Sequence, residues 1–270
     1  MSTIHAEFQS NALTRPAEFW MFLPEKLPVE IFGPNPHYDR PPKTLSLLHG
    51  YTGSCSDWLY HSPAAELSMK YNLAVVMPTG GISFYLDRPG VGNAYGRFVG
   101  NDLPVYLQNT FGLAGRREDT IIAGNSMGGF GALHTALAYP ERFGYAIGLS
   151  SALIIHQVAG MTPEAERDRS NIMADYAYYR EIFGDPGRVL ESTNNPETLV
   201  KNWKAEGKAL PKLFMACGTE DFLLEQNREF HRFLVREQVP VKYVEAPGVH
   251  DWAFWKKMIE PAVQWALEAE

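Results

Sequence analysis

The sequence predicts an α/β fold, in which a mostly parallel central sheet carries helices on both faces. Short continuous apolar runs recur along the chain, as in strands that are buried on both sides. Segments with helical apolar periodicity separate several of these runs. The chain has 270 residues, of which 45% are hydrophobic, and this is enough for one large core.

The apolar runs are predicted as strands, and they cover residues 19–23, 44–48, 73–77, 119–123, 145–149, 212–216 and 241–245. The last of them is less apolar, so we place it nearer an edge of the sheet. Helices are predicted over residues 102–111, 195–206, 222–237 and 252–268. The second begins with Asn195 as N-cap and Pro196 at the first helical position. The alternation implies right-handed crossovers between parallel strands.

Two segments interrupt the alternation. Residues 33–43 hold four prolines and are predicted to form a loop. Residues 151–211 are the longest stretch without a predicted strand, and a helix is expected over 164–181. In an α/β domain such an excursion forms either a second helical layer or a lid over a pocket. We therefore predict a single domain over residues 1–270, with 151–211 as a candidate cap or lid.

Composition excludes several classes of protein. A net charge of −7 without a long basic run argues against nucleic-acid binding. Two cysteines, Cys55 and Cys217, are too few for a disulfide framework and suggest reduced thiols in the cytoplasm. The N-terminus lacks the apolar core of a signal peptide, and no apolar run approaches the roughly 20 residues of a membrane span. No metal motif is present, so no metal or cofactor is expected.

The stretch Gly124-Asn125-Ser126-Met127-Gly128 matches the pattern G-x-S-x-G. It lies between a predicted strand and a helical segment, where this pattern makes a sharp turn that exposes the serine hydroxyl. A Cβ atom at either glycine would collide with the neighbouring strand or helix. The amide of Met127, at a helix N-terminus, could donate to a developing oxyanion. The alternative is a glycine-rich helix start with a buried serine, but the context favours a nucleophile.

A base and an acid should follow the serine in the order Ser, acid, His. His250 follows the last predicted strand in a Pro/Gly loop, whereas His156 has no strand end to hold it and His231 lies within a predicted helix. Glu220 and Asp221 follow the strand 212–216. Asp221 is the preferred acid, although it would also suit as the N-cap of the next helix. Glu220 is the alternative.

A second oxyanion donor should come from the loop after an early strand. The strand 44–48 leads into His49-Gly50-Tyr51. Gly50 lets the backbone turn so that the Tyr51 N–H faces the site. His49 is out of order for the base, and we interpret it as a structural histidine whose ring bonds loop backbone.

Several motifs together resemble a known family. They are GNSMGGFGALHTAL, CGTEDFLLEQN and HDWAFW, with an HG-x-x-G motif followed by Trp58 and a VMP segment before an aromatic loop. This set resembles the putative esterase (esterase D-like) family of α/β-hydrolases, and within it the bacterial tributyrin-esterase branch. The likeness covers roughly residues 44–266 and is weakest across 151–211.

The resemblance implies an α/β-hydrolase fold and a serine carboxylesterase that needs no cofactor. It implies Ser126, Asp221 and His250 as catalytic triad, with Tyr51 and Met127 as oxyanion donors. The expected substrates are small-molecule esters of short acyl groups, such as acetyl or butyryl esters, and acetylated or feruloylated sugars. The resemblance also allows a homo-oligomer.

Two alternatives stay open. The first is an S-formylglutathione hydrolase, because that branch carries a cysteine close after its first oxyanion loop; Cys55 lies about two residues late for this role. The second is a catalytically silent binding protein on the same scaffold. Trp58, Tyr85 and Trp252 are candidates for the substrate pocket, with ordinary core packing as their alternative role.

Overall fold

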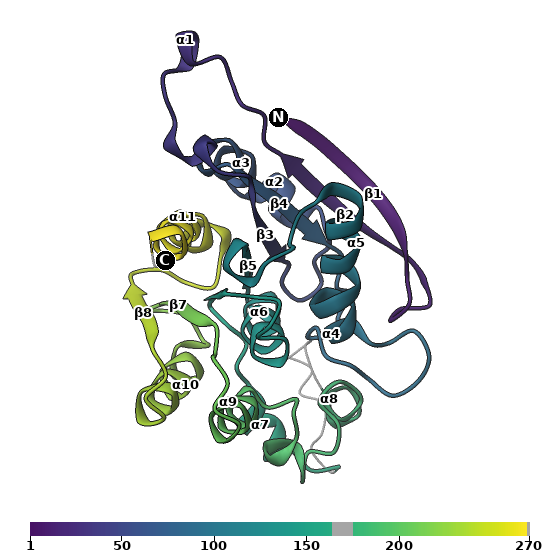
Figure 1. The fold of residues 1–270 in the computed structure, drawn as a ribbon. Coiled ribbons are helices and arrows are strands. Elements are labelled where there is room, and N and C mark those ends of the chain that lie inside the picture. The colour runs from purple at the N-terminus through teal and green to yellow at the C-terminus, as the bar shows by residue number, and fades with distance from the viewer. Residues whose placement is uncertain (164–174, 269–270) are drawn as a thin grey trace.

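The computed structural model describes residues 1–163 and 175–268 and has one eight-stranded sheet at its centre (Figure 1). The strand order is β1-β2-β4-β3-β5-β6-β7-β8. Strands β3 to β8 run parallel, whereas β2 is antiparallel to both β1 and β4. The strands are β1 Ser2–Ser10, β2 Arg15–Leu23, β3 Lys43–Leu48, β4 Leu73–Pro78, β5 Thr120–Asn125, β6 Tyr145–Leu149, β7 Lys212–Gly218 and β8 Val241–Ala246.

Each predicted strand is present within about two residues of its expected ends, except that β2 begins four residues earlier, at Arg15. The prediction that 241–245 lies near an edge is confirmed, because β8 is the last strand of the sheet. Strand β1 is an addition that the apolar runs did not predict. It is the other edge strand, and most of its residues alternate between half-buried and exposed. It therefore lacks the continuous apolar run of a strand covered on both faces.

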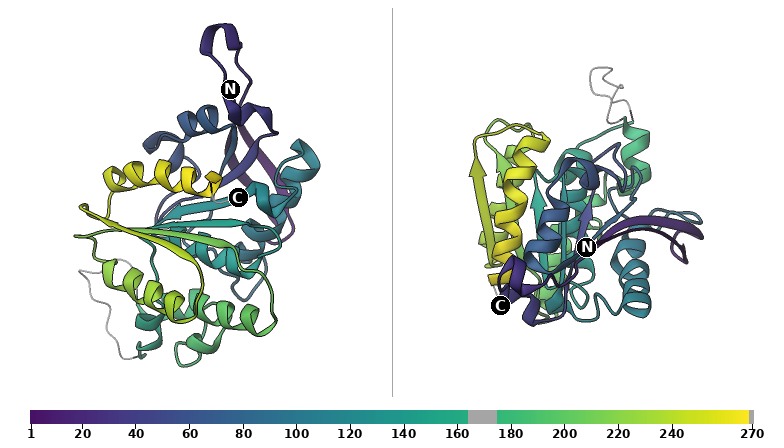
Figure 2. Two further views of the ribbon diagram at one scale, coloured as in Figure 1. Left: turned by 60° about the vertical axis from the view of Figure 1, so that its left-hand side comes forward. Right: turned by 90° about the horizontal axis from the view of Figure 1, so that it is seen from above.

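Helices cover both faces of the sheet (Figures 1 and 2). Helices α2, α3 and α11 pack on one face, and α5, α6 and α10 pack on the other. The longer helices are α2 Asp57–His61, α3 Ala64–Tyr71, α5 Leu103–Phe111, α6 Met127–Ala138, α7 Ile155–Ala159, α8 Tyr176–Phe183, α9 Pro196–Ala205, α10 Leu224–Arg236 and α11 Trp252–Glu268. Short turns are α1 Val29–Phe32, η1 Pro36–Asp39, α4 Tyr95–Arg97, the π-helical η2 Phe98–Asp102, η3 Arg117–Asp119 and η4 Val189–Glu191.

The helices predicted over 102–111, 195–206, 222–237 and 252–268 correspond to α5, α9, α10 and α11. As predicted, the Asn195 side chain caps α9 by accepting from the amide of Glu197. Most of the helix expected over 164–181 falls on 164–174, which lie outside the described residues, and α8 begins after them. Helices α2 and α3 were not predicted.

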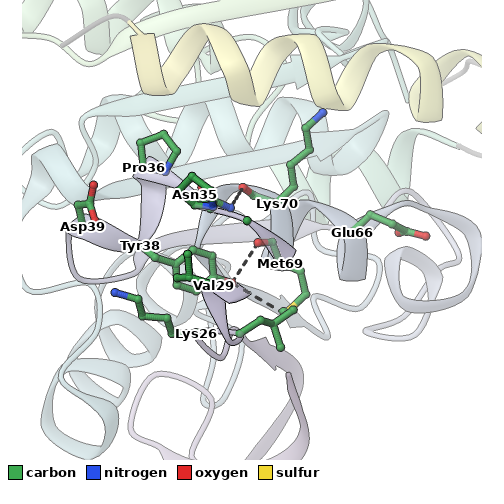
Figure 3. Close-up of a pocket in the computed structure, with 12 residues that line it drawn as sticks. Lys26, Val29, Asn35, Pro36, Tyr38, Asp39, Glu66, Met69 and Lys70 are labelled. Carbon is green, nitrogen blue, oxygen red and sulfur yellow. Dashed lines mark hydrogen bonds between the residues drawn. The ribbon is translucent and has the colours of Figure 1, made fainter. Parts of the chain in front are cut away.

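The predicted proline-rich loop is the base of an arm, residues 24–42, that projects from the body at α1 (Figure 1). Here η1 lies beside α3 and encloses a hollow of about 510 Å³ (Figure 3). Asn35 Nδ2 donates to the Lys70 carbonyl and Tyr38 Oη donates to the Met69 carbonyl, both at 3.0 Å. The charged side chains around the hollow balance, with two lysines, Lys26 and Lys70, against two acids, Asp39 and Glu66.

Across the described ranges, no helix combines the length and apolarity that a membrane crossing needs. The single-domain organisation of residues 1–270 stays a prediction.

Candidate active site

Ser126 forms the sharp turn between β5 and α6. Its backbone has φ 55° and ψ −119°, a left-handed conformation that costs a non-glycine residue about 1–3 kcal/mol. A Cβ atom at Gly124 would lie 2.3 Å from the Gly128 carbonyl oxygen, and one at Gly128 would lie 2.1 Å from the Leu48 carbonyl oxygen. Both glycines are therefore required by close backbone packing, as the motif predicted.

Backbone hydrogen bonds hold this turn in place. The Ser126 amide donates to the Leu149 carbonyl at 2.9 Å, while the amides of Phe130 and Ala152 donate to the Ser126 carbonyl. The amide of Ser126 is thus occupied. That of Met127 has no protein acceptor among the described residues.

The side chains of Ser126, His250 and Asp221 form one continuous hydrogen-bonded path. His250 Nε2 lies 2.9 Å from Ser126 Oγ, and His250 Nδ1 lies 3.0 and 2.9 Å from the two carboxylate oxygens of Asp221. Ser126 follows β5, Asp221 follows β7 and His250 follows β8, so the path crosses the carboxyl ends of the parallel strands. The Asp221 carboxylate is fully buried, and the imidazole keeps 17% of its surface exposed.

Asp221 is held as an ionised carboxylate. Burial raises its pKa, but hydrogen bonds from His250, from the Leu223 amide and from the Ser150 hydroxyl together outweigh burial, so the pKa lies below its ordinary value. The bond from Leu223 shows that Asp221 also stabilises the turn before α10. Glu220 takes another place: it is exposed and accepts a 2.7 Å hydrogen bond from the Gly248 amide. Of the two candidate acids, only Asp221 reaches the imidazole.

A second layer behind Asp221 was not predicted from the sequence. Trp255 Nε1 donates to Ser150 Oγ at 3.1 Å, and the Trp255 ring stands edge-on to His250 with centroids 5.1 Å apart. Ser150 is buried, directly follows β6 and has φ 46°. Its position after a predicted strand, between the serine and the acid, is the signal that could have identified it.

The loop after β3 lies against the serine turn. A Cβ atom at Gly50 would sit 3.5 Å from Ser126 Cβ. His49 is buried and bonds loop backbone as predicted: Nδ1 lies 2.7 Å from the Gly50 carbonyl, and Nε2 accepts from the Gly80 amide at 2.8 Å. These partners require a neutral ring with its proton on Nδ1, and burial lowers the pKa of His49 accordingly. The Tyr51 amide has no protein acceptor in the described parts of the chain.

Part of the 151–211 segment reaches this loop. The ring of Tyr178, on α8, stands edge-on to that of Tyr51 with centroids 6.0 Å apart. Tyr178 Oη also donates to the Ile82 carbonyl at 3.2 Å, and Glu181 pairs with Arg88 at 2.7 Å. Helix α8 is therefore fastened beside the loop that carries Tyr51.

The candidate pocket aromatics need a correction. Trp58 and Tyr85 are 1% and 0% exposed, and their polar atoms donate to the carbonyls of Leu48 and His49. Both belong to the core and offer no surface to a substrate, so core packing accounts for them. Trp252 is half-buried against Trp58. The exposed aromatic beside the imidazole is instead Phe222, whose ring centroid lies 4.6 Å from that of His250.

Comparison with known proteins gives a consistent result. Residues 10–266 match the family described as Putative esterase. The chain is 41% identical over 265 residues to an acetyl esterase of Caldicellulosiruptor saccharolyticus, covering 98% of each chain. Among solved structures, it resembles fluorophosphonate-binding serine hydrolase F of Staphylococcus aureus, with a TM-score of 0.81 and 28% identity. It also resembles an S-formylglutathione hydrolase of Staphylococcus aureus, with a TM-score of 0.80 and 27% identity. Both structural matches cover 98% of each chain.

Proposed function

The chain is a carboxylic ester hydrolase that belongs to the putative esterase family and has the α/β-hydrolase fold, and we propose that Ser126 is its nucleophile, His250 its general base and Asp221 the acid that orients the base. The observation that carries this proposal is the hydrogen-bonded path from Ser126 Oγ through the imidazole to the buried carboxylate. A serine hydroxyl becomes an effective nucleophile when a positioned base accepts its proton.

In the proposed reaction, His250 Nε2 takes the proton of Ser126 while Oγ bonds to the ester carbonyl carbon. The imidazolium then donates that proton to the oxygen of the leaving alcohol as the bond between this oxygen and the acyl carbon breaks. Water attacks the acyl-enzyme by the same route, with His250 again as base, and releases the carboxylic acid. Asp221 stays ionised throughout, which its lowered pKa favours, and stabilises the imidazolium.

We assign the oxyanion to the amides of Met127 and Tyr51. Both are unoccupied by protein acceptors among the described residues, and the Met127 amide lies at the start of α6. Amides at a helix N-terminus stabilise negative charge without having to reorganise during the reaction. His49 supports the assignment because it fixes the Gly50 carbonyl on one side of the loop.

We propose short-chain acyl esters as substrates, in the manner of the tributyrin-esterase branch. Acetyl and butyryl esters come first, and acetylated or feruloylated sugars are further candidate substrates. The acetyl esterase, 41% identical over the whole chain, supports this choice. Helix α8 beside Tyr51 supports residues 151–211 as a cap over the site.

An S-formylglutathione hydrolase is the second candidate, favoured by the likeness to the Staphylococcus aureus enzyme. Cys55 gives that reading little support. It is buried, and burial raises the pKa of its thiol. Cys55 and Cys217 are both free, which supports the cytoplasm as the proposed location. The homo-oligomer stays a prediction.

The test combines active-site labelling with substrate profiling. A fluorophosphonate probe should label the wild type at Ser126, located by peptide mass spectrometry. Rates are measured on p-nitrophenyl acetate, butyrate and octanoate, S-formylglutathione and methyl ferulate. Ser126→Ala should lower turnover by about 10⁴-fold or more. Ser151→Ala is the matched control, because this hydroxyl is buried nearby and has no hydrogen-bond partner among the residues that the structure describes. This variant should keep its rate within about twofold.

The outcomes separate the candidates. Faster cleavage of acetate and butyrate than of octanoate supports the short-chain esterase. S-formylglutathione as the best substrate replaces it with the thioesterase. Labelling at another residue, or a Ser126→Ala variant with near-normal turnover, overturns the assignment of the nucleophile, and no labelling together with no turnover supports the binding protein.

A further inference from the structure

A second hollow lies at the opposite ends of the strands that carry the candidate active site. It has a volume of about 600 Å³, within the range of small-molecule sites. Its walls come from the amino ends of β3, β6 and β7 and from the turn that precedes β5. The lining residues are Arg40, Lys43, Arg116, Arg117, Glu118, Asp119, Gly144, Tyr145, Ala209, Leu210 and Lys212.

Direct contacts join the walls into one structure. The Gly144 amide donates to the Arg117 carbonyl at 2.8 Å, and a Cβ atom at Gly144 would lie only 2.5 Å from that oxygen. Arg117 Nη2 donates to the Leu210 carbonyl, and the Lys212 amide donates to the Gly144 carbonyl. Lys43 Nζ donates to the Glu118 carbonyl. Hydrogen bonds thus hold the hollow together across four segments of the chain.

The hollow is strongly positive, although the chain as a whole carries a net charge of −7. Five cationic side chains face two acidic ones. Both acids are already engaged: Arg116 Nε lies 3.5 Å from Glu118 and 3.3 Å from Asp119, and Lys43 Nζ lies 3.6 Å from Asp119.

Three of the cations have no carboxylate partner in residues 1–163 and 175–268. Arg40 donates to the carbonyls of Pro41, Tyr71 and Asn72, and Arg117 to that of Leu210. Lys212 lies over the ring of Tyr145, with Nζ 5.6 Å from its centroid. These contacts position the three side chains without a close ion pair, although Asp119 acts on Arg40 and Glu118 acts on Arg117 at longer range.

The cations also act on one another. Burial lowers the pKa of Lys43, and the charges of Arg40 and Arg116 lower it further, against the opposing effect of Asp119. Like charges held this close repel, so an anion among them would relieve an unfavourable interaction. Guanidinium groups are suited to binding such an anion, because one guanidinium can donate two parallel hydrogen bonds to two oxygens of a phosphate or carboxylate group.

We propose that this hollow binds a small multivalent oxyanion, a metabolite bearing two or more phosphate or carboxylate groups, through Arg40, Arg117 and Lys212. The proposal is independent of the ester hydrolysis, since the site shares no residue with the serine turn. Arg40 and Arg117 stand on different loops, so a ligand with two anionic groups can engage both.

Isothermal titration calorimetry tests the proposal with pyrophosphate and citrate as probes, at constant ionic strength and with acetate as a monovalent reference. One-site saturable binding of pyrophosphate or citrate, tighter than that of acetate, is expected. The tighter probe distinguishes a phosphate ligand from a polycarboxylate. The titration is repeated on protein labelled with fluorophosphonate, which should bind equally well because the serine site lies elsewhere.

The double variant Arg117→Gln/Lys212→Gln should bind at least about tenfold more weakly, because charge-assisted hydrogen bonds are lost. The matched control is Lys256→Gln/Lys257→Gln, which removes two exposed charges from α11 and should bind as the wild type does. Circular dichroism checks that both variants are folded. Absence of saturable binding to either probe overturns the proposal, as does equal weakening in the control.

Discussion

The two ends of the same parallel strands differ in how they handle charge. At the carboxyl ends, Asp221 is buried, and its carboxylate accepts hydrogen bonds from the Leu223 amide and from the imidazole of His250. At the amino ends, cationic side chains outnumber acidic ones around an open hollow, and the direct contacts of Arg117 and Lys212 are a carbonyl and an aromatic ring. Both ends bring together residues from distant segments, because the loops between parallel strands lie either at the carboxyl ends or at the amino ends of the strands. The difference suggests different chemistry for the two candidate sites: a buried carboxylate can orient an imidazole, whereas accessible cationic side chains can bind an anion.

Asp221→Asn tests the acid at the carboxyl ends, and its effect should be the largest after that of Ser126→Ala. A neutral amide lacks the charge that stabilises the imidazolium, and its NH₂ group can hold the imidazole in the wrong tautomer, so kcat/KM for p-nitrophenyl acetate should fall by about 10³–10⁴-fold. Glu220→Gln is the matched variant. It changes an exposed carboxylate that bonds the Gly248 amide and should cost less than about fivefold. Equal losses in the two variants would contradict the assignment of Asp221.

His49→Phe should have the next largest effect on rate. The change keeps a ring but removes the bonds to the Gly50 carbonyl and the Gly80 amide. A loosened oxyanion loop should lower kcat by about 10–100-fold with little change in KM. His61→Phe, an exposed histidine on α2, serves as control. A change confined to KM would show that the loop binds substrate and does not stabilise the oxyanion.

Comparison of the wild type with His49→Phe also tests how the free energy of unfolding depends on pH. The pKa of folded His49 lies below the ordinary value near 6.5. Its contribution to stability is therefore complete above that value and is lost as the pH falls through the lowered pKa, because the unfolded state binds the proton more readily. The difference in unfolding free energy between wild type and His49→Phe should shrink from pH 7 to pH 4.5 in urea titrations. A difference that grows on acidification would reverse the sign.

At the amino ends, a substitution at Gly144 should change the free energy of unfolding but not the rate of ester hydrolysis. Gly144→Ala places a Cβ atom 2.5 Å from the Arg117 carbonyl oxygen, which should lower the free energy of unfolding by about 1–3 kcal/mol. The kcat per folded molecule should stay the same. In Gly160→Ala, the nearest atom is 3.6 Å away, so this control should change stability by less than about 0.5 kcal/mol.

The smallest effect is expected for Arg117→Gln/Lys212→Gln on hydrolysis. The two side chains stand at the far ends of the strands, so kcat/KM should stay within about twofold of the wild type. Initial rates on p-nitrophenyl acetate measure it. A loss above about fivefold would show that the two ends are coupled and would break the comparison.

Sequence reasoning predicted that Ser126, Asp221 and His250 lie together, because all three follow predicted strands whose carboxyl ends meet. Gly124 and Gly128 mark the turn around Ser126, and strand ends mark the positions of Asp221 and His250. The parallel strands were predictable because they are buried on both faces and therefore read as apolar runs. Strand β1 was missed because an edge strand exposes alternate side chains.

The amino ends gave no such signal. Arg40, Lys43, Arg117 and Lys212 are dispersed along the chain and form no motif, and only the strand order brings them together. Ser150 was missed for a related reason, since its role depends on Trp255 reaching it from α11. Trp58 and Tyr85 show the reverse: both were candidates for the substrate pocket, with core packing as the alternative, and the structure buries both in the core.

Ser126 and His250 lie 124 residues apart in the sequence, so the candidate active site forms only when two distant parts of the chain have folded together. The serine turn belongs to the middle of the sheet, whereas the imidazole arrives with the edge strand β8 and is braced by α11. Under the proposed mechanism, hydrolysis requires this edge strand to be in place, because the base follows it. Recovery of hydrolysis after denaturation would then report that the middle and the edge of the sheet have assembled together.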